Sequence, residues 1–464
     1  MAPAHSNNNA ARWLALATSL GFAKLIIFVL DSNPQVFMGD SMSYLTTALL
    51  KWIPPDRSFV YGFLVDDLTA RSRSLSSLVA VQTFAGIGTA LIAAAILVRF
   101  MRAPFGIAAA AAVLLALEPQ QLLYERFVMT ESLGTAFFAV FMFLALEYLR
   151  SRRTWALIAI QLAGIILVAF RVTYVPIVAV TTVAAPLLTF VVAEQRKRDT
   201  PRFAAHLAIG LLLFYGLHTA YKRWNGWLSD LPPAYTYADG FFLIANVAPL
   251  VTPADTDNPE LAVVLSQPLA HAGAPDDAGF RNAEMFSPDG LVARVKEAMK
   301  DDYQANAEAR SIALHVISRD PVGFIRLAIQ TYSKFYSREY MSDILRAEAG
   351  MRELGPDELK ILSHYHLDAQ GLPLMKTITR QYHIAAWPWY LLLLHTPLAL
   401  MASVALARRD TRKYVWFVLL IGAVHVTVVQ LLGVEPSPRH LHSMAVLWAI
   451  VLAATAARIT AGRS

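Results

Sequence analysis

Four short segments of the sequence place charged side chains directly beside long apolar stretches, where buried charges are costly and tend to be functional. The first, MGDSMSYLTTALLKW (38–52), carries Asp40 and Tyr44 just after the first apolar stretch. A carboxylate there can face an active site at the membrane surface. The competing interpretation is that Asp40 only caps the helix that follows, since Asp after Gly is a favoured N-cap residue.

The second segment, EPQQLLYERFVMTES (118–132), holds Glu118, Glu125, Arg126 and Glu131 between two apolar stretches. Such a density of charge is typical of a functional site in a membrane protein. Glu131 also stands at the start of a predicted helix, where the helix dipole stabilises an acid, so a purely structural role competes for it.

The third and fourth places are basic. Arg171 falls at a tight turn between two apolar stretches, and GVEPSPRHLHSM (433–444) presents Arg439 and His440 before the last one. An anionic partner would explain both arginines. The alternative is that their side chains extend to the phosphates of membrane lipids.

The elements that must position these residues are membrane-spanning helices. Of the 464 residues, 56% are hydrophobic and 16% are charged, and the mean hydropathy is +0.45, too apolar for a soluble chain. Inside lipid a helix satisfies its own backbone groups, so each long apolar stretch is predicted to be a spanning helix. We expect about ten spans: 13–30, 76–98, 104–121, 132–149, 154–170, 172–193, 203–221, 385–407, 414–433 and 441–457. The third is the weakest, because Glu118-Pro119 cuts it short.

The basic residues predict the orientation, since loops rich in Lys and Arg stay cytoplasmic. Six windows carry a net charge of +13 against −7 for the rest of the chain; they are 1–12, 99–102, 150–153, 194–202, 408–413 and 458–464. All six fall on one side of a ten-span topology, which places both termini in the cytoplasm. The isoelectric point of about 9.4 therefore reflects topology, and we do not expect nucleic-acid binding.

The predicted organisation is an N-terminal transmembrane module (1–221), an extracytoplasmic region (222–384) and three C-terminal spans (385–464). The first half of 222–384 is rich in Pro, Gly, Asp and Asn and is predicted to be loop. Its second half is predicted to be helical from 291 to 317 and again after Asp320-Pro321. The absence of cysteine excludes disulfides and a cysteine nucleophile. The Ala-rich composition is typical of a bacterial inner membrane protein.

Taken together, these segments resemble polyprenyl-phosphate-sugar-dependent glycosyltransferases of the GT-C superfamily, which includes protein mannosyltransferases and lipid A aminoarabinose transferases. The resemblance rests on the order of short motifs: Asp-Ser-x-x-Tyr at 40–44, Tyr61-Gly62 before a span bearing Gln82, Met129-Thr130-Glu131, and Arg439. The chain departs from the pattern after its first acid, where Pro54-Pro55 is followed by Asp56-Arg57.

The resemblance implies an all-α membrane protein that transfers a sugar from a polyprenyl-phosphate donor to a glycan, lipid or protein acceptor outside the cytoplasm. Asp40 would be the general base, assisted by Glu131. The residues expected to bind the donor phosphate are Arg126, Arg171, Arg439, Lys222 and Arg223. The residues expected to contact the sugar or acceptor are Tyr44, Glu125 and His440. A divalent cation, Mg²⁺ or Mn²⁺, is left open as a cofactor.

Two other classes of protein remain as alternatives. A transporter or flippase of lipid-linked glycans would also have many spans, although transporters usually place ionisable residues at the membrane centre, whereas these charges gather at helix ends. A non-catalytic envelope assembly protein would use 222–384 as an interaction domain and would not need carboxylates facing the membrane surface.

Overall fold

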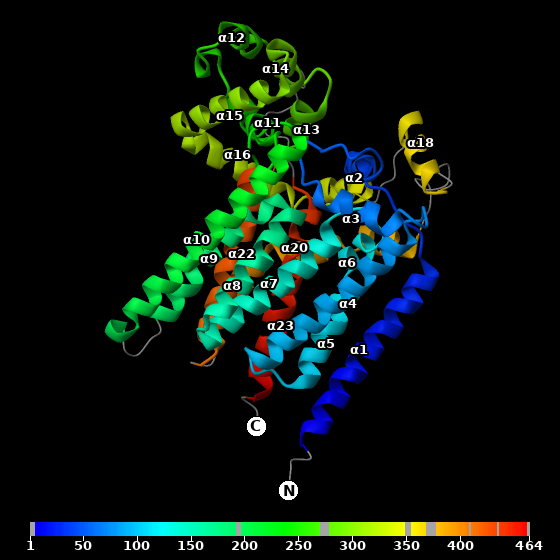
Figure 1. The fold of residues 1–464 in the computed structure, drawn as a ribbon, viewed down its shortest axis with the longest axis vertical. Helices are drawn as coiled ribbons and strands as arrows, with labels where there is room; N and C mark the ends of the chain where they lie inside the picture. Colours follow the sequence, from blue (N-terminus) through cyan, green and yellow to red (C-terminus); the bar gives the residue numbers. More distant parts are fainter. Residues whose placement is uncertain are drawn as a thin grey trace.

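The computed structural model describes residues 5–191, 196–269, 278–348, 354–367, 377–407, 410–433 and 436–461, and these residues are helical almost throughout. The β-type pairing found among them is one isolated parallel bridge between Gln35 and Phe127. Figure 1 shows a bundle of long helices with the group α11–α16 at one end, while α1 begins and α23 ends at the other. The prediction of an all-helical protein is confirmed.

The bundle contains the apolar helices of both halves of the chain, most of them long. Its N-terminal part comprises α1 (His5–Leu30), α4 (Ser76–Arg99), α5 (Phe105–Ala116), α6 (Pro119–Tyr124), α7 (Glu131–Ser151), α8 (Thr154–Phe170), α9 (Val175–Val191) and α10 (Arg196–Ser229). Its C-terminal part comprises α20 (Trp387–Leu394), α21 (Thr396–Leu406), α22 (Arg412–Leu432) and α23 (Met444–Ala461). Among the described residues five segments are long and apolar enough to cross a membrane, and they lie in α1, α4, α7, α9 and α10. The chain is therefore a helical protein with five candidate transmembrane segments among its described residues.

Two of the ten predicted spans are broken. Helix α5 ends before Glu118-Pro119 and α6 follows, as the weakness of the third span predicted. The eighth span is interrupted at His395, which separates α20 from α21, and this break was not predicted. Pro397 lies at the start of α21, and because proline lacks an N–H and clashes with the preceding turn, it favours a new helix start.

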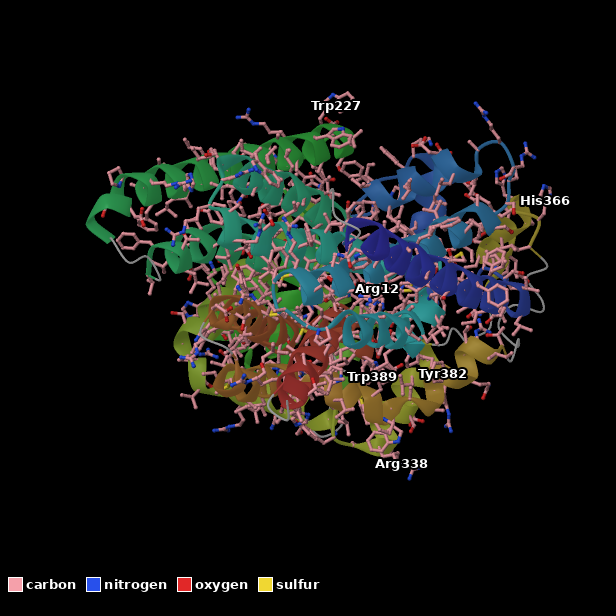
Figure 2. All side chains as sticks on the ribbon, turned by 90° about the horizontal axis from the view of Figure 1, so that it is seen from below. Arg12, Trp227, Arg338, His366, Tyr382 and Trp389 are labelled. Carbon is pink, nitrogen blue, oxygen red and sulfur yellow. The ribbon has the colours of Figure 1, made fainter. Side chains whose placement is uncertain are left out.

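The basic windows of the sequence meet at one end of the bundle. Ion pairs join Arg102 to Asp410 and Arg152 to Asp199, while Lys413 donates a hydrogen bond to the carbonyl of Leu149. Figure 2 views the molecule from below and labels Arg12 on α1. The charge asymmetry of the sequence thus corresponds to a physical end of the fold.

The opposite end begins with two short helices, α2 (Met38–Leu50) and α3 (Val60–Thr69). The helix predicted to follow Asp40 and carry Tyr44 is confirmed, although it begins two residues earlier, at Met38. The two helices are in close contact at Gly62, where a Cβ would collide with the side chain of Thr47. This contact fixes the turn that contains residues 51–59.

The region between α10 and α20 is helical in both halves. It comprises α11 (Asp239–Val247), α12 (Pro259–Ser266), α13 (Ala278–Phe286), α14 (Leu291–Met299), α15 (Asp302–Arg319), α16 (Pro321–Lys334), α17 (Arg338–Glu348), α18 (Pro356–His364) and α19 (Ile378–Ala385). Helices α11 to α15 bury a separate apolar core that includes Phe241, Ile244 and Val295.

The predicted helix start at Asp320-Pro321 is confirmed, since the Asp320 carboxylate accepts a hydrogen bond from the Gly323 N–H at 2.7 Å. The prediction that the first half is loop is wrong at α11, α12 and α13. Short apolar groups there fold against α14 and α15, and Asn258 caps α12 by accepting from two backbone N–H groups. The helical pattern over 291–317 is two helices, separated where Lys300 adopts a left-handed conformation.

Candidate functional site

Asp40 lies in the first turn of α2 but does not cap it. The N-cap position is Phe37, and no side chain caps this helix end. Instead, one Asp40 oxygen lies 2.9 Å from Nη1 of Arg57, and the other accepts a hydrogen bond from Nη1 of Arg439 at 2.5 Å. Asp40 is therefore an ion-paired carboxylate and not the cap of α2.

The two arginines reach Asp40 from distant parts of the chain. Arg57 follows Pro54-Pro55, pairs also with Asp56, and lies 5.5 Å from the centre of the Tyr44 ring. Arg439 comes from a 3-10 turn, η5 (Pro438–Leu441), just before α23, and lies over the Phe37 ring at 4.9 Å. Aromatic rings thus cover both guanidinium groups, which favours them by cation–π attraction and fixes their orientation.

The paired arginines control the charge of Asp40. Burial alone would favour the neutral acid, but Arg439 and Arg57 outweigh it and hold the pKa of the Asp40 carboxyl below its usual value of 3.8. Asp40 is consequently a carboxylate at neutral pH. Three quarters of its side chain is nevertheless shielded from solvent, so the charge depends on these partners.

A second acid–arginine pair lies beside the first. Glu131 opens α7, and its carboxylate lies 3.3 Å from Nη1 of Arg171, which follows α8 in an extended conformation. Tyr44 connects the pairs, because its hydroxyl bonds with Thr130 while its ring contacts Arg57. Burial, together with the nearby Asp40 and Glu131, raises the pKa of Tyr44 to about 12, so the phenol stays neutral.

His440 belongs to the same group of residues. Burial first, and then the positive charges of Arg439 and Arg171, hold the pKa of His440 below its ordinary value of 6.5. Its imidazole is therefore neutral at pH 7 and is able to donate one hydrogen bond and accept another. We call the set Asp40, Tyr44, Arg57, Glu131, Arg171, Arg439 and His440 the arginine–acid cluster.

Glu125 and Arg126 belong to a buried network, and no described hydrogen bond or ion pair joins either of them to this cluster. Both side chains are 0% exposed; Glu125 binds Nζ of Lys24 at 2.5 Å and Nη1 of Arg126 at 3.0 Å. Arg126 also donates to the carbonyls of Asp31 and Leu122, both at 3.0 Å. The sequence prediction gave these two residues contacts with acceptor and phosphate, but charges committed to each other in the interior favour a structural role.

This network fixes the segment that leads to Glu131. Gln82 of α4 donates a hydrogen bond to the carbonyl of Phe127 at 2.9 Å, and Tyr61 donates to Gln82 at 2.9 Å. The Gln82 carbonyl in turn accepts from Ser132 at 3.1 Å. Two residues singled out by sequence, Tyr61 and Gln82, thus act by positioning the 125–132 segment.

The turn that carries Arg439 is held by buried acids and histidines. Ser437 donates to Glu348 at the end of α17, and Glu348 lies 3.7 Å from Nε2 of His383. Three residues after Arg439, His442 lies 3.1 Å from Thr135 and 3.7 Å from Glu118. The helical region 222–384 therefore contributes directly to the placement of Arg439.

Lys222 and Arg223 lie near the end of α10, and no described contact joins them to the arginine–acid cluster. Nζ of Lys222 lies 5.3 Å from the centre of the Tyr235 ring, and Arg223 is exposed. The exposed Trp227, labelled in Figure 2, lies at the periphery of the bundle, as expected of a membrane-interface anchor.

Arg57 is the member of the cluster that sequence reasoning missed as a site residue. The available signal was the departure after Pro54-Pro55, where an acidic and a basic residue stand next to each other. No local pattern shows that Arg57 turns back to Asp40. The contact depends on the packing of α2 against α3.

The described side chains give no support to a divalent cation. Among them no group of three or more His, Asp or Glu is placed to hold a metal ion. The carboxylates of Asp40 and Glu131 are each turned to arginine instead.

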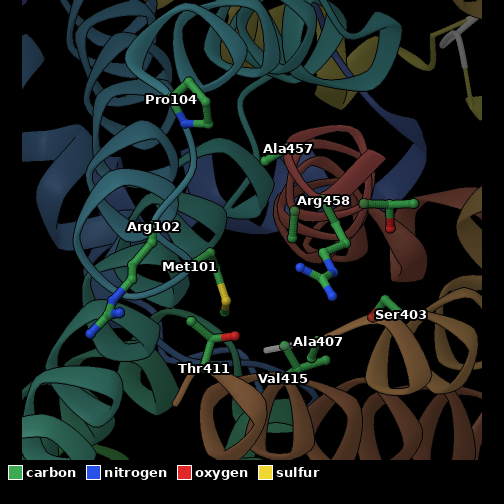
Figure 3. A pocket seen from close by; sticks show the side chains of 11 residues that line it. Met101, Arg102, Pro104, Ser403, Ala407, Thr411, Val415, Ala457 and Arg458 are labelled. Carbon is green, nitrogen blue, oxygen red and sulfur yellow. The ribbon is translucent and has the colours of Figure 1, made fainter. Parts of the chain in front are cut away.

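A cavity of about 120 Å³ lies at the end of the bundle that carries the basic windows (Figure 3). Its lining includes Arg102, Thr411 and Arg458 and contains none of the predicted site residues. It is separate from the arginine–acid cluster.

Comparison of the chain with models of known protein families and with curated protein sequences finds no match.

Proposed function

We propose that the chain is an integral-membrane glycosyltransferase that moves a sugar from a polyprenyl-phosphate donor to a glycan, lipid or protein acceptor. In this proposal the ten predicted spans cross the bacterial inner membrane with both termini in the cytoplasm. The arginine–acid cluster then faces the extracytoplasmic side, and the GT-C-like sequence motifs lie within it or directly support it.

The single observation that carries the proposal is the convergence of three arginines and two acids from five separate places in the sequence. Each arginine forms an ion pair with one of the acids: Arg57 and Arg439 with Asp40, and Arg171 with Glu131. Guanidinium groups bind phosphate oxygens with the same paired geometry that they use for carboxylates. A phosphate entering from the bilayer can therefore take the place that a carboxylate occupies in the free protein.

The reaction needs one base and a stabilised leaving group. An acceptor hydroxyl oxygen attacks the anomeric carbon, the bond from that carbon to the phosphate oxygen breaks, and the phosphate departs with the electron pair. Asp40 takes the hydroxyl proton, and Arg439 and Arg171 stabilise the charge that develops on the phosphate. A single displacement of this kind inverts the anomeric configuration.

Asp40 as found here is a weak base, because its two arginines hold its pKa down. Binding of the donor phosphate would raise the pKa of Asp40. When the phosphate draws Arg439, Arg57 or both towards itself, Asp40 loses the charges that lower its pKa and becomes more basic. The exchange links phosphate binding to activation of the acceptor hydroxyl.

The experiment compares wild type with Asp40→Asn in lipid nanodiscs supplied with a panel of polyprenyl-phosphate sugars and candidate acceptors. Asp66→Asn is the matched control, since Asp66 lies on the neighbouring helix α3 and pairs with Lys51 at the end of α2. The proposal expects turnover to fall by about 10²–10⁴-fold in Asp40→Asn, the range for loss of a general base, with donor binding retained. Asp66→Asn should keep wild-type turnover. Transport of a lipid-linked sugar without its cleavage, or failure of wild type to bind any donor, would instead favour the flippase or the assembly protein.

A further inference from the structure

Helix α16 carries an apolar stripe that no other part of the described chain covers. Val322, Ile325 and Ile329 are 66%, 52% and 61% exposed. Their spacing of three and four residues places them on one face of the helix. The opposite face is already used, because Leu327 and Ala328 are buried. The helix therefore has one apolar face towards the protein and another that is bare.

The bare stripe lies at the boundary between the bundle and the extramembrane helices. Figure 1 shows α16 on the underside of the group α11–α16, beside the ends of α10 and α22, and α16 packs against α22. Tyr336, just beyond α16, hydrogen-bonds through its hydroxyl to Nε2 of His395 at 3.0 Å. His395 is the break between α20 and α21, so the end of α16 is attached to the bundle itself.

Exposed apolar side chains are also present on α21, the helix that begins directly after His395. Leu398 and Met401 of α21 are largely exposed, as expected of side chains that face lipid. The side chains at the edge of the α16 stripe suit a membrane surface: Arg326 is exposed, and Tyr336 presents a ring with a polar tip. Tyrosines are enriched where bilayers meet water, and an arginine can extend its charged end to the lipid phosphates while its apolar stem lies along the bilayer.

We propose that α16 is an interfacial helix that lies in the bilayer surface, with Val322, Ile325 and Ile329 in contact with the acyl chains. An amphipathic helix with basic residues on its flanks binds a bilayer in this way. Contact with lipid fixes the distance of the region 222–384 from the membrane. The inference rests on the membrane character of the bundle and is independent of the proposed chemistry.

The chain contains no cysteine, so single labelling sites can be introduced without removing native thiols. Spin labels are attached at Ile325→Cys and, in a second variant, at Ile329→Cys, in protein reconstituted into nanodiscs. Val263→Cys is the matched control, because Val263 is also an exposed apolar residue, 63% exposed, on α12 at the far side of the domain in Figure 1. Collision of each label with oxygen, which concentrates in lipid, and with a water-soluble nickel chelate is measured.

The proposal predicts that labels at 325 and 329 collide with the nickel chelate several-fold less often than the label at 263, and with oxygen more often. Equal nickel accessibility at all three positions would overturn the proposal, because α16 would then face water. Shielding of 325 and 329 from both reagents would also overturn it, since that result means a protein partner or a second copy covers the stripe.

Discussion

Replacement of Arg439 by Gln separates a chemical role of this side chain from a structural one. The variant removes one guanidinium group, its 2.5 Å hydrogen bond to Asp40 and its contact with the Phe37 ring. Asp40 keeps Arg57 at 2.9 Å, so no unpaired charge is left behind. A hydrogen bond to a charged group contributes about 1.5–3 kcal/mol when buried, and because the pair is partly exposed we expect a loss of stability of about 1–2 kcal/mol.

The expected loss of activity is larger. If Arg439 stabilises charge on the departing phosphate, its removal should lower the turnover number by about 10²–10³-fold, equivalent to about 2.7–4 kcal/mol of transition-state stabilisation. The assay is release of polyprenyl phosphate in nanodiscs, with unfolding by denaturant measured on the same samples. Arg310→Gln is the control, since Arg310 pairs with Asp239 in the distant group α11–α16. A variant at Arg439 that is destabilised but turns over within about threefold of wild type would refute the catalytic role.

Three further predictions concern the packing and charge of the same end of the fold. Gly86→Ala should lower the free energy of unfolding by about 1–3 kcal/mol, because the added Cβ would collide with Glu125. Gly88→Ala is the control, since its Cβ would meet open space. Equal denaturation midpoints for the two variants would show that Glu125 moves aside without cost. Lys24→Met removes one of the two cations that bind Glu125 and should lower the free energy of unfolding by about 3 kcal/mol, the lower end of the range for breaking a buried ion pair. The measurement is denaturation in detergent micelles, and an unchanged midpoint would mean that the ion pair is not formed. Folding lowers the pKa of Asp40, so its carboxylate stabilises the protein fully above the ordinary pKa of 3.8 and loses this contribution as the pH falls below that value. The loss of stability caused by Asp40→Asn should therefore be full at pH 7 and should shrink below about pH 4. A stability difference that does not change with pH would contradict the ion pairs.

Hydropathy predicted the helical bundle because each span must satisfy its backbone groups within lipid. Each of the ten predicted stretches contains a helix or a broken pair of helices, and the break at Glu118-Pro119 was foreseen. The break at His395 was missed because the apolar residues on either side of His395-Thr396-Pro397 were interpreted as one span, although Pro397 is a signal for a new helix start. The short helices α11 to α13 were missed because turn residues surround them closely.

The candidate site was predictable only in part. Asp40, Tyr44, Glu131, Arg171, Arg439 and His440 were all named from their positions beside apolar stretches, and the structure brings them together. Glu125 and Arg126 carry the same sequence signal but point into the interior, and composition does not reveal which face of a short helix is buried. The pairing of Asp40 with Arg439 spans 399 positions, a distance over which no local pattern acts.

The most direct test of the central claim is mass-spectrometric detection of free polyprenyl phosphate after purified wild-type protein in nanodiscs meets a polyprenyl-phosphate sugar and a mixture of envelope acceptors. The account predicts release of polyprenyl phosphate in equal amount to glycosylated acceptor, and loss of both products when Asp40 is replaced by Asn. Intact donor across the whole panel, with wild type folded and the acceptors present, would contradict it.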